Sequence, residues 1–286
     1  EKQKYHQIRR NTGAYFTSLE LTDYRMNVLV QEIINSKQNI AELKFLEPCV
    51  GTGNFVFSYL KEITKLELTS NEIYRLINNM YFADINELSI REFKKNFKEF
   101  VKIYFDINLD SNYFDNRIAK GLLVNVLSDE LSYIPIEKAF PTSIVKKGFD
   151  IVVTNPPYKN LKAERKHYDT KEDYDVAKKK YSEVGAVIKN ELKYSTSGTL
   201  NLYKLFVEEI VDKYTNENGF INLLIPSSIL TDKSCTKLRS YLLLNHKISS
   251  IKVIDEGSGY VNAQQALATM LIQKGKKTTN LKITRD

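Results

Sequence analysis

The chain has 286 residues, of which 42% are hydrophobic and 27% charged, and its net charge is +7. These values are typical of a folded globular protein large enough for one α/β domain or two small ones. Two cysteines do not suggest a disulfide framework, and no apolar run approaches the ~18 residues of a membrane span, so we expect a cytoplasmic protein. The positive charge suits a polyanionic partner without requiring one.

Short apolar runs alternate with stretches of helical period along most of the chain. Residues 1–12 are polar and basic and predict an arm, and Thr22 or Asp23 is expected to cap the first helix. The predicted strands are 43–46, 80–83, 121–127, 149–154, 220–225, 248–255 and 266–273. The further predicted helices are 54–66, 87–100, 202–210 and 232–244.

This alternation predicts an α/β fold with a doubly wound, mostly parallel, seven-stranded sheet. The last two strands are joined by only about ten residues, which is too short for a helical crossover, so the last strand is expected to be antiparallel. Residues 159–198 differ in texture, because Lys159 to Lys193 carry 10 Lys or Arg and 7 Asp or Glu. We interpret 159–198 as an inserted excursion that either contacts DNA phosphates or is a solvated loop.

The tetrad Asn155-Pro156-Pro157-Tyr158 directly follows the buried strand Phe149–Thr154. Ligands of open α/β sheets bind at the carboxyl ends of strands. Two consecutive prolines cannot continue a ladder, so they form a stiff loop that fixes the Asn side chain and the neighbouring carbonyl groups. Rigid acceptors beside an aromatic ring suit a planar substrate with an exocyclic amine, such as adenine.

A second loop, Glu47–Phe55, contains Gly51 and Gly53 between a predicted strand and a predicted helix, which is the setting of a nucleotide-like cofactor. The third glycine of a dinucleotide fingerprint is absent, because Val56 occupies its place. Asp84 ends the next strand and can accept both hydroxyls of a ribose or cap a helix. Asp129 follows the third predicted strand and can accept from an adenine amine or serve as a turn residue.

The order of these motifs resembles the gamma-class N6-adenine DNA methyltransferases of restriction–modification systems over about residues 13–275. Gly13–Ser18 resembles the motif G-x-Y-x-T-P of that class, with Ser18 in place of Pro, and Asn155–Tyr158 matches its catalytic tetrad in full. The further correspondences are Glu47–Phe55 for the cofactor loop, Asp84 for ribose, Asp129 for the cofactor's adenine, Asn201–Phe206 for the helix that closes that pocket, Gly219–Ser228 for the following strand, and Tyr260 for a second aromatic on the target base.

The resemblance implies a Rossmann-like fold, S-adenosylmethionine as cofactor, and methyl transfer to the N6 amine of an adenine in double-stranded DNA. The implied cofactor contacts are Tyr15, Thr17, Glu47, Pro48, Gly51, Gly53, Asp84, Asp129, Asn155 and Phe206. Asn155, Pro156, Pro157 and Tyr158 would be catalytic. The Asn155 oxygen and the Pro156 carbonyl would accept the two hydrogens of the amine, and Tyr158 and Tyr260 would sandwich the flipped base.

Other readings of the same residues remain open. Pro48-Cys49 is reminiscent of the cytosine methyltransferase nucleophile but lies in the cofactor loop, so Cys49 is interpreted as a packing residue. His6, His167 and His246 lack metal-ligand spacing and are expected at the surface, and no metal site is predicted. The tetrad also suits methylation of a protein glutamine or RNA, and a non-catalytic nucleic-acid-binding subunit is a third possibility.

A sequence-reading region is not recognisable in residues 1–286, because only twelve residues follow Lys274. We therefore expect the whole chain to be a catalytic domain, with DNA recognition supplied by a further domain or a partner subunit.

Overall fold

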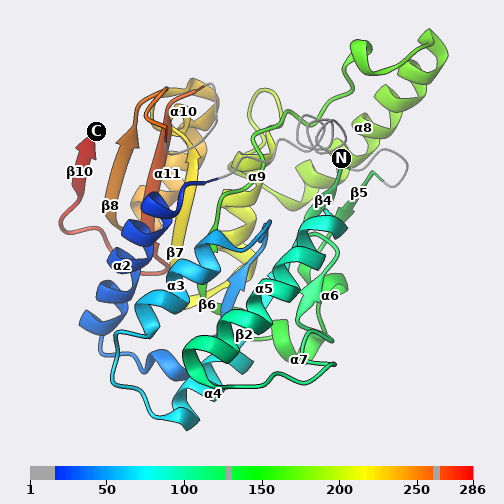
Figure 1. The fold of residues 1–286 in the computed structure, drawn as a ribbon. Helices are drawn as coiled ribbons and strands as arrows, with labels where there is room; N and C mark the ends of the chain where they lie inside the picture. Colours follow the sequence, from blue (N-terminus) through cyan, green and yellow to red (C-terminus); the bar gives the residue numbers. More distant parts are fainter. Residues whose placement is uncertain (1–16, 127–130, 260–264, 286) are drawn as a thin grey trace.

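An eight-stranded sheet lies at the centre of the computed structural model, which describes residues 17–126, 131–259 and 265–285 (Figure 1). The strand order is β10-β8-β9-β7-β6-β1-β2-β3. The strands are β1 (Phe45–Glu47), β2 (Met80–Ala83), β3 (Ile118–Ala119), β6 (Phe149–Thr154), β7 (Thr215–Pro226), β8 (Lys247–Ile254), β9 (Leu267–Gln273) and β10 (Lys282–Arg285). Only β9 runs against its neighbours β7 and β8, so the mostly parallel α/β fold with an antiparallel late strand is confirmed.

The prediction that residues 121–127 form the third strand of the main sheet is wrong. The chain joins the main sheet earlier, through β3, and residues 121–127 instead contain β4 (Leu123–Asn125), which pairs with β5 (Ser132–Ile134) in a separate antiparallel sheet. Gly121 has φ +92° and Leu123 has φ +64°, so the backbone turns away from the sheet between β3 and β4. With β3 in that place and β10 added, the main sheet has eight strands where seven were expected.

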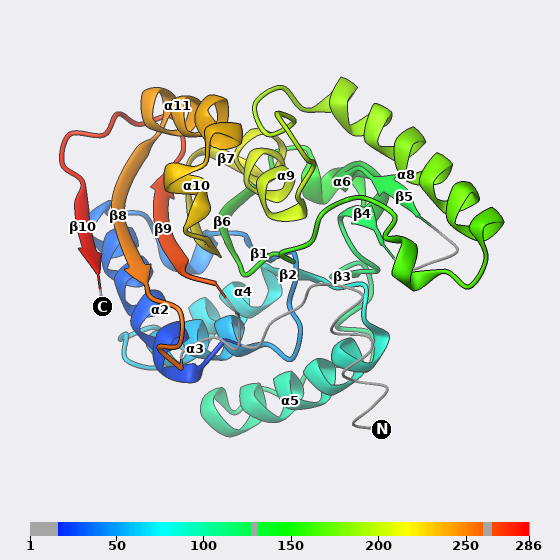
Figure 2. The same cartoon turned by 90° about the horizontal axis from the view of Figure 1, so that it is seen from above.

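Helices cover both faces of the sheet and enclose two separate cores (Figure 2). One face carries α2 (Leu19–Asn35), α3 (Asn54–Ile63), α4 (Ser70–Asn78) and α5 (Glu87–Phe105), and the other carries α6 (Ile136–Ala139), α7 (Thr142–Val145), α8 (Lys171–Glu191), α9 (Leu202–Glu209), α10 (Ser228–Thr231) and α11 (Thr236–Asn245). Alternate residues of one strand serve the two cores, as Val152 and Ile151 do in β6.

Short turns complete the chain between these elements. They are η1 (Ile40–Glu42), η2 (Arg165–His167), the π-helical turn η3 (Ile210–Tyr214) and η4 (Lys233–Cys235). Asp232 caps η4, and α11 begins only at Thr236, four residues after the predicted start.

The capping residues show where the predicted helix starts and the predicted set of helices were wrong. The Ser18 hydroxyl, rather than Thr22 or Asp23, caps α2 by accepting from Leu21 N–H, because the apolar period of α2 already begins at Leu21. Helix α4 was not predicted, although Thr69 and Glu72 form a capping box that is visible in the sequence. No helix in the described parts of the chain is long and apolar enough to cross a membrane.

Candidate active site

Two loops emerge side by side from the carboxyl end of the sheet. Strands β1 and β6 pair in parallel, with Phe45 opposite Ile151 and Leu46 opposite Val152. The glycine loop after β1 and the tetrad after β6 are therefore neighbours, in the place where open α/β sheets bind ligands. The strand pairing, rather than closeness in sequence, brings residues about 100 positions apart into one site.

Gly51 and Gly53 of the glycine loop have different structural roles. Both have positive φ, +53° at Gly51 and +98° at Gly53. A Cβ on Gly53 would lie 2.6 Å from the Phe93 ring of α5, so this glycine permits close packing of the loop against α5. A Cβ on Gly51 would meet nothing within 4 Å, so the backbone there is open to the approach of a ligand.

Asp84 holds the glycine loop from the neighbouring strand. One of its carboxylate oxygens accepts from Gly51 N–H at 2.8 Å, and the other accepts from Asn86 N–H at 2.8 Å. Burial raises the pKa of Asp84, and the N–H groups of Asn86, Gly51 and Ile85 oppose that rise. The side chain expected to bind ribose thus lies at the site, and each of its oxygens keeps further accepting capacity.

Glu47, the last residue of β1, is buried beneath the loop. Its two carboxylate oxygens and the Thr154 hydroxyl have no hydrogen-bond partner among the described residues. Burial raises the pKa of Glu47 well above its usual value; the nearby Thr154 hydroxyl and Cys49 backbone, which do not meet hydrogen-bond geometry, oppose the rise only in part. A buried carboxyl group without a partner is costly, so its presence points to a ligand with a donor or a positive charge.

The tetrad connects to both sides of the site. Asn155 Nδ2 donates to Thr17 Oγ1 at 3.0 Å, and the Tyr158 hydroxyl donates to Asn155 Oδ1. The same hydroxyl lies 3.0 Å from the carbonyl oxygen of Leu224 in β7. Asn155 and Tyr158 are half-buried, so both hydrogen-bonded side chains remain partly exposed.

Three more predicted contacts have defined positions, and three do not. Thr17 is buried between the tetrad and the glycine loop, where its carbonyl oxygen accepts from Asn54 Nδ2 at 2.7 Å. Pro48 is buried. Phe206 of α9 is 4% exposed and belongs to the core that lies between the sheet and the helices α6 to α11. Tyr15, Asp129 and Tyr260 lie outside the described residues.

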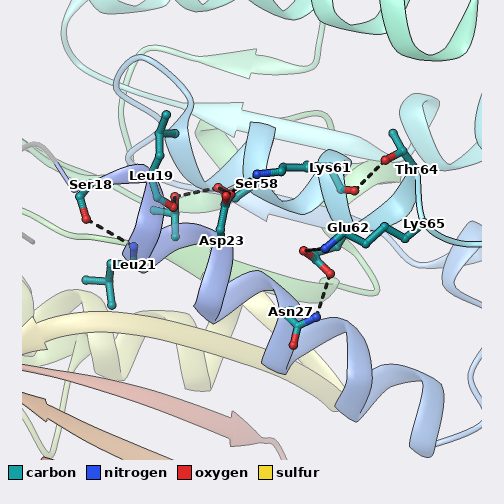
Figure 3. Close-up of polar contacts among 11 residues, drawn as sticks. Ser18, Leu19, Leu21, Asp23, Asn27, Ser58, Lys61, Glu62, Thr64 and Lys65 are labelled. Atoms are coloured by element: carbon teal, nitrogen blue, oxygen red, sulfur yellow. Dashed lines mark hydrogen bonds and ion pairs between the residues drawn. The ribbon is translucent and has the colours of Figure 1, made fainter. Parts of the chain in front are cut away.

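Polar contacts between α2 and α3 fix the helix that follows the glycine loop (Figure 3). Thr22 and Ser58 share a 2.7 Å hydrogen bond between their hydroxyls, and Ser58 and Lys61 both donate to the Asp23 carboxylate. The Asn27 amide donates to Glu62 at 2.9 Å further along. Asp23 and Thr22 therefore join two helices instead of capping one.

The excursion after the tetrad contains an ordered helix. The chain leaves at Asn160 and returns at Asn201, where the two residues form an antiparallel bridge. Helix α8 lies between them and extends away from the sheet (Figure 1). Glu208 of α9 anchors the return, because its carboxylate accepts from the backbone N–H groups of 193–195. Glu208 and Asn54 were not among the predicted residues, because no local pattern in the sequence marks either of them.

Cys49 and His246, for which the sequence predicted no catalytic or metal-binding role, lie in different surroundings. Cys49 is half-buried against the core, and burial raises the pKa of its thiol well above the usual value, as suits a packing residue rather than a nucleophile. His246 was expected at the surface but is 4% exposed, and its Nδ1 accepts from Gly275 N–H. It is buried because it lies at the junction of α11 and β8, under the turn after β9.

Three solved structures share this fold. The DrdV–DNA complex matches 97% of this chain and 28% of that chain with a TM-score of 0.69 at 14% identity. A modification subunit of a putative type I restriction enzyme from Vibrio vulnificus YJ016 matches 97% and 48% (TM-score 0.59, 16% identity). A putative class I S-adenosylmethionine-dependent methyltransferase from Listeria monocytogenes matches 94% and 65% (TM-score 0.57, 14% identity). The chain thus spans less than two thirds of each of these proteins.

A family comparison covers the core of the site. Residues 58–259 match the family described as Eco57I restriction-modification methylase, whereas no curated protein matches. The matched range begins in α3, just after the glycine loop, and contains Asp84 and the whole tetrad. Because this match takes in well over half of the chain and the fold agrees with it, the chain belongs to the Eco57I restriction-modification methylase family.

Proposed function

We propose that this chain transfers a methyl group from S-adenosylmethionine to the N6 amine of an adenine in double-stranded DNA, as a gamma-class enzyme of a restriction–modification or related defence system. The observation that carries the proposal is the parallel pairing of β1 with β6, which places the glycine loop beside Asn155-Pro156-Pro157-Tyr158. Family membership supports a methylase of restriction–modification systems. The adenine target rests on the tetrad.

The residues after β1 and β2 fit the cofactor. Gly51 leaves open space at its backbone, and the Glu47 carboxyl, which has no hydrogen-bond partner in the described part of the chain, suits the positively charged end of S-adenosylmethionine. Asp84 would accept from the ribose while it holds the loop, and Phe206 with Pro48 would line the apolar part. The cofactor would supply an electrophilic methyl group; the protein supplies shape and charge around it. Contacts by Tyr15, Thr17, Gly53, Asp129 and Asn155 stay predictions.

The tetrad fits an amine nucleophile. The N6 lone pair of adenine is delocalised into the ring, so the amine reacts only if its hydrogens are held out of the ring plane. Asn155 Oδ1 and the Pro156 carbonyl are the acceptors proposed for the two hydrogens. Tyr158, with Tyr260, would stack on the base, at about 1–3 kcal/mol for each ring. This is catalysis by positioning and charge stabilisation, without a covalent intermediate.

Duplex DNA is the proposed partner. A protein of this fold has been solved with DNA, and the exposed Lys178, Lys179 and Lys180 of α8 suit contacts with phosphates. α8 rises beyond the end of the sheet (Figure 1). A DNA-recognition domain or subunit beside this chain is part of the proposal, because the chain spans only part of the proteins it resembles.

The test is tritiated methyl incorporation into DNA, RNA and protein measured side by side with the full-length protein. We expect label in DNA, in the form of N6-methyladenine. Asn155→Ala should lower the rate at saturating S-adenosylmethionine about 100-fold or more. Label in RNA or protein alone, or an unchanged rate in Asn155→Ala, would refute the proposal, and absence of cofactor binding would favour a non-catalytic nucleic-acid-binding subunit.

A further inference from the structure

The exposed lysines of α8 leave the helix in different directions. Lys178, Lys179 and Lys180 are consecutive, and each residue of an α-helix is turned about 100° from the one before it. Lys178 instead shares one line along the helix with the exposed Lys171 and Lys189, because spacings of 7, 11 and 18 residues are close to whole numbers of turns. We call Lys171, Lys178 and Lys189 the lysine stripe.

Two contacts fix how α8 is rotated about its own axis. A Cβ on Gly185 would lie 3.3 Å from Leu200, so this side of the helix faces the chain that returns toward α9. The Glu191 carboxylate accepts from Lys213 Nζ at 2.9 Å, so that side faces η3. Around the helix, the lysine stripe lies within about 40° of Gly185, whereas Lys180 lies about 20° from Glu191. The stripe therefore borders the side of α8 that faces Leu200.

Leu200 lies beside the chain that leaves the tetrad. Its carbonyl oxygen accepts from Leu161 N–H at 2.8 Å, and Asn160 forms its bridge with Asn201 directly next to this contact. Tyr158 ends the tetrad only two positions before Asn160. The lysine stripe is therefore on the side of α8 that is turned toward the tetrad.

The outgoing segment of the excursion adds positive charge to the same side. It runs along α8, because Tyr168 of this segment packs against Tyr174 of α8 with ring centroids 6.0 Å apart. In Figure 2 the outgoing segment and α8 extend together away from the sheet. The segment carries the exposed Lys162 and Arg165. Exposed cations of two chain segments thus lie along one side of the excursion.

The acidic residues of α8 lie mostly on other sides of the helix. Asp175 is about 50° from the lysine stripe around the helix. The remaining acids of α8 are more than a quarter turn away from the stripe, and they are Glu172, Asp173, Glu183 and Glu191. The stripe therefore presents positive charge, which is the charge that a surface for phosphate groups needs.

We propose that the lysine stripe binds the phosphate backbone of the DNA duplex that flanks the target adenine, and that Lys179 and Lys180 do not. The inference rests on the proposed function, because it takes duplex DNA as the partner. The stripe extends over about 27 Å of α8, so it can contact several phosphates of one duplex. Phosphate contacts fix the position of DNA without reading its sequence. The stripe would therefore hold the duplex beside the tetrad and leave sequence recognition to another domain or subunit.

The test compares two double variants of the full-length protein that remove the same charge from the same helix. Lys178→Gln/Lys189→Gln changes the stripe, and Lys179→Gln/Lys180→Gln is the matched control. Fluorescence anisotropy measures the Kd for a duplex of about 30 base pairs between about 50 and 200 mM salt. The stripe variant should raise the Kd about 10-fold or more and lower the slope of log Kd against log salt by about 2, because each phosphate contact contributes about 0.9 to that slope. The control should change the Kd less than about twofold and leave the slope unchanged.

The outcomes separate this inference from the proposed function. Equal effects of the two variants, no effect of the stripe variant, or tighter binding of double-stranded RNA than of the DNA duplex would overturn the inference. Duplex binding that depends on the stripe without any methyl transfer would refute the proposed function and leave the inference standing. Methyl transfer to DNA with no effect of the stripe variant would do the reverse. The calorimetric Kd for S-adenosylmethionine should be equal in the two variants, because both change only exposed side chains of α8.

Discussion

The carboxylate of Asp84 accepts a 2.8 Å hydrogen bond from Gly51 N–H, so the residue that ends β2 holds the loop that follows β1. The other oxygen accepts from Asn86 N–H. One side chain thereby shapes the glycine loop and the start of α5 together. This explains how an acid expected to contact a ligand also contributes to the fold of the site.

Asp84→Asn should weaken the binding of S-adenosylmethionine. An amide offers one acceptor where the carboxylate offers two, so one of the two N–H groups loses its partner. We expect the calorimetric Kd to rise about 10-fold and the free energy of unfolding to fall by about 1–2 kcal/mol. The control is Glu87→Gln, because Glu87 is an exposed acid that begins α5. An unchanged Kd would argue against the role of Asp84.

Gly51→Ala and Gly53→Ala should separate ligand binding from stability. Each places a Cβ at positive φ, which costs about 1–2 kcal/mol. Only at Gly53 does the new Cβ also collide with Phe93, so Gly53→Ala should lose about 1–3 kcal/mol more. Gly51→Ala should fold nearly normally and bind the cofactor poorly, because the Cβ fills the open space. Thermal unfolding and calorimetry test the pair, and equal unfolding temperatures would contradict it.

Glu47→Gln should stabilise the protein at neutral pH while it weakens cofactor binding. The pKa of Glu47 is raised in the folded state, so the folded protein holds a proton that the unfolded chain releases above about pH 4.3. The stability from this group is complete below that pH and is lost as the pH rises toward the folded-state pKa. Glutamine carries no such loss.

The measurement is unfolding by denaturant from pH 4 to pH 8. Glu47→Gln should be more stable than wild type at pH 8, and the difference should shrink toward pH 4. The exposed Glu87→Gln again serves as control. A gain that does not depend on pH would show that the buried carboxyl group is not responsible.

Glu208→Ala should loosen the return of the excursion. Its carboxylate accepts from Lys193, Tyr194 and Ser195 N–H, with 2.6 Å to the first and the last, and it is 2% exposed. Removing a buried charged acceptor should cost about 2–4 kcal/mol. Amide hydrogen exchange should accelerate at 193–195 while β6 stays protected. Glu183→Ala, an exposed acid of α8, should change neither.

Local pattern alone predicted much of the fold. The strands at 80–83 and 149–154 have the predicted bounds, because short apolar runs between polar turns have few other ways to be buried. The prediction failed where the chain leaves the sheet. Nothing local distinguishes 121–127 from a sheet strand, and the positive φ of Leu123 belongs to the packing around it. It also failed at α4, a short helix that buries only Leu76 and Ile77, and at α8, which buries only Gly185 and Ile188.

By itself the sequence determined the α/β class, the glycine loop, Asp84 and the tetrad, because each depends on residues adjacent in the chain. The tertiary structure decided which of them meet. It placed β1 beside β6, brought Thr17 to Asn155 across 138 positions, and left Glu47 without a hydrogen-bond partner among the described residues. These relationships depend on parallel strand order and helix packing, which bring together side chains whose sequence separation carries no record of contact.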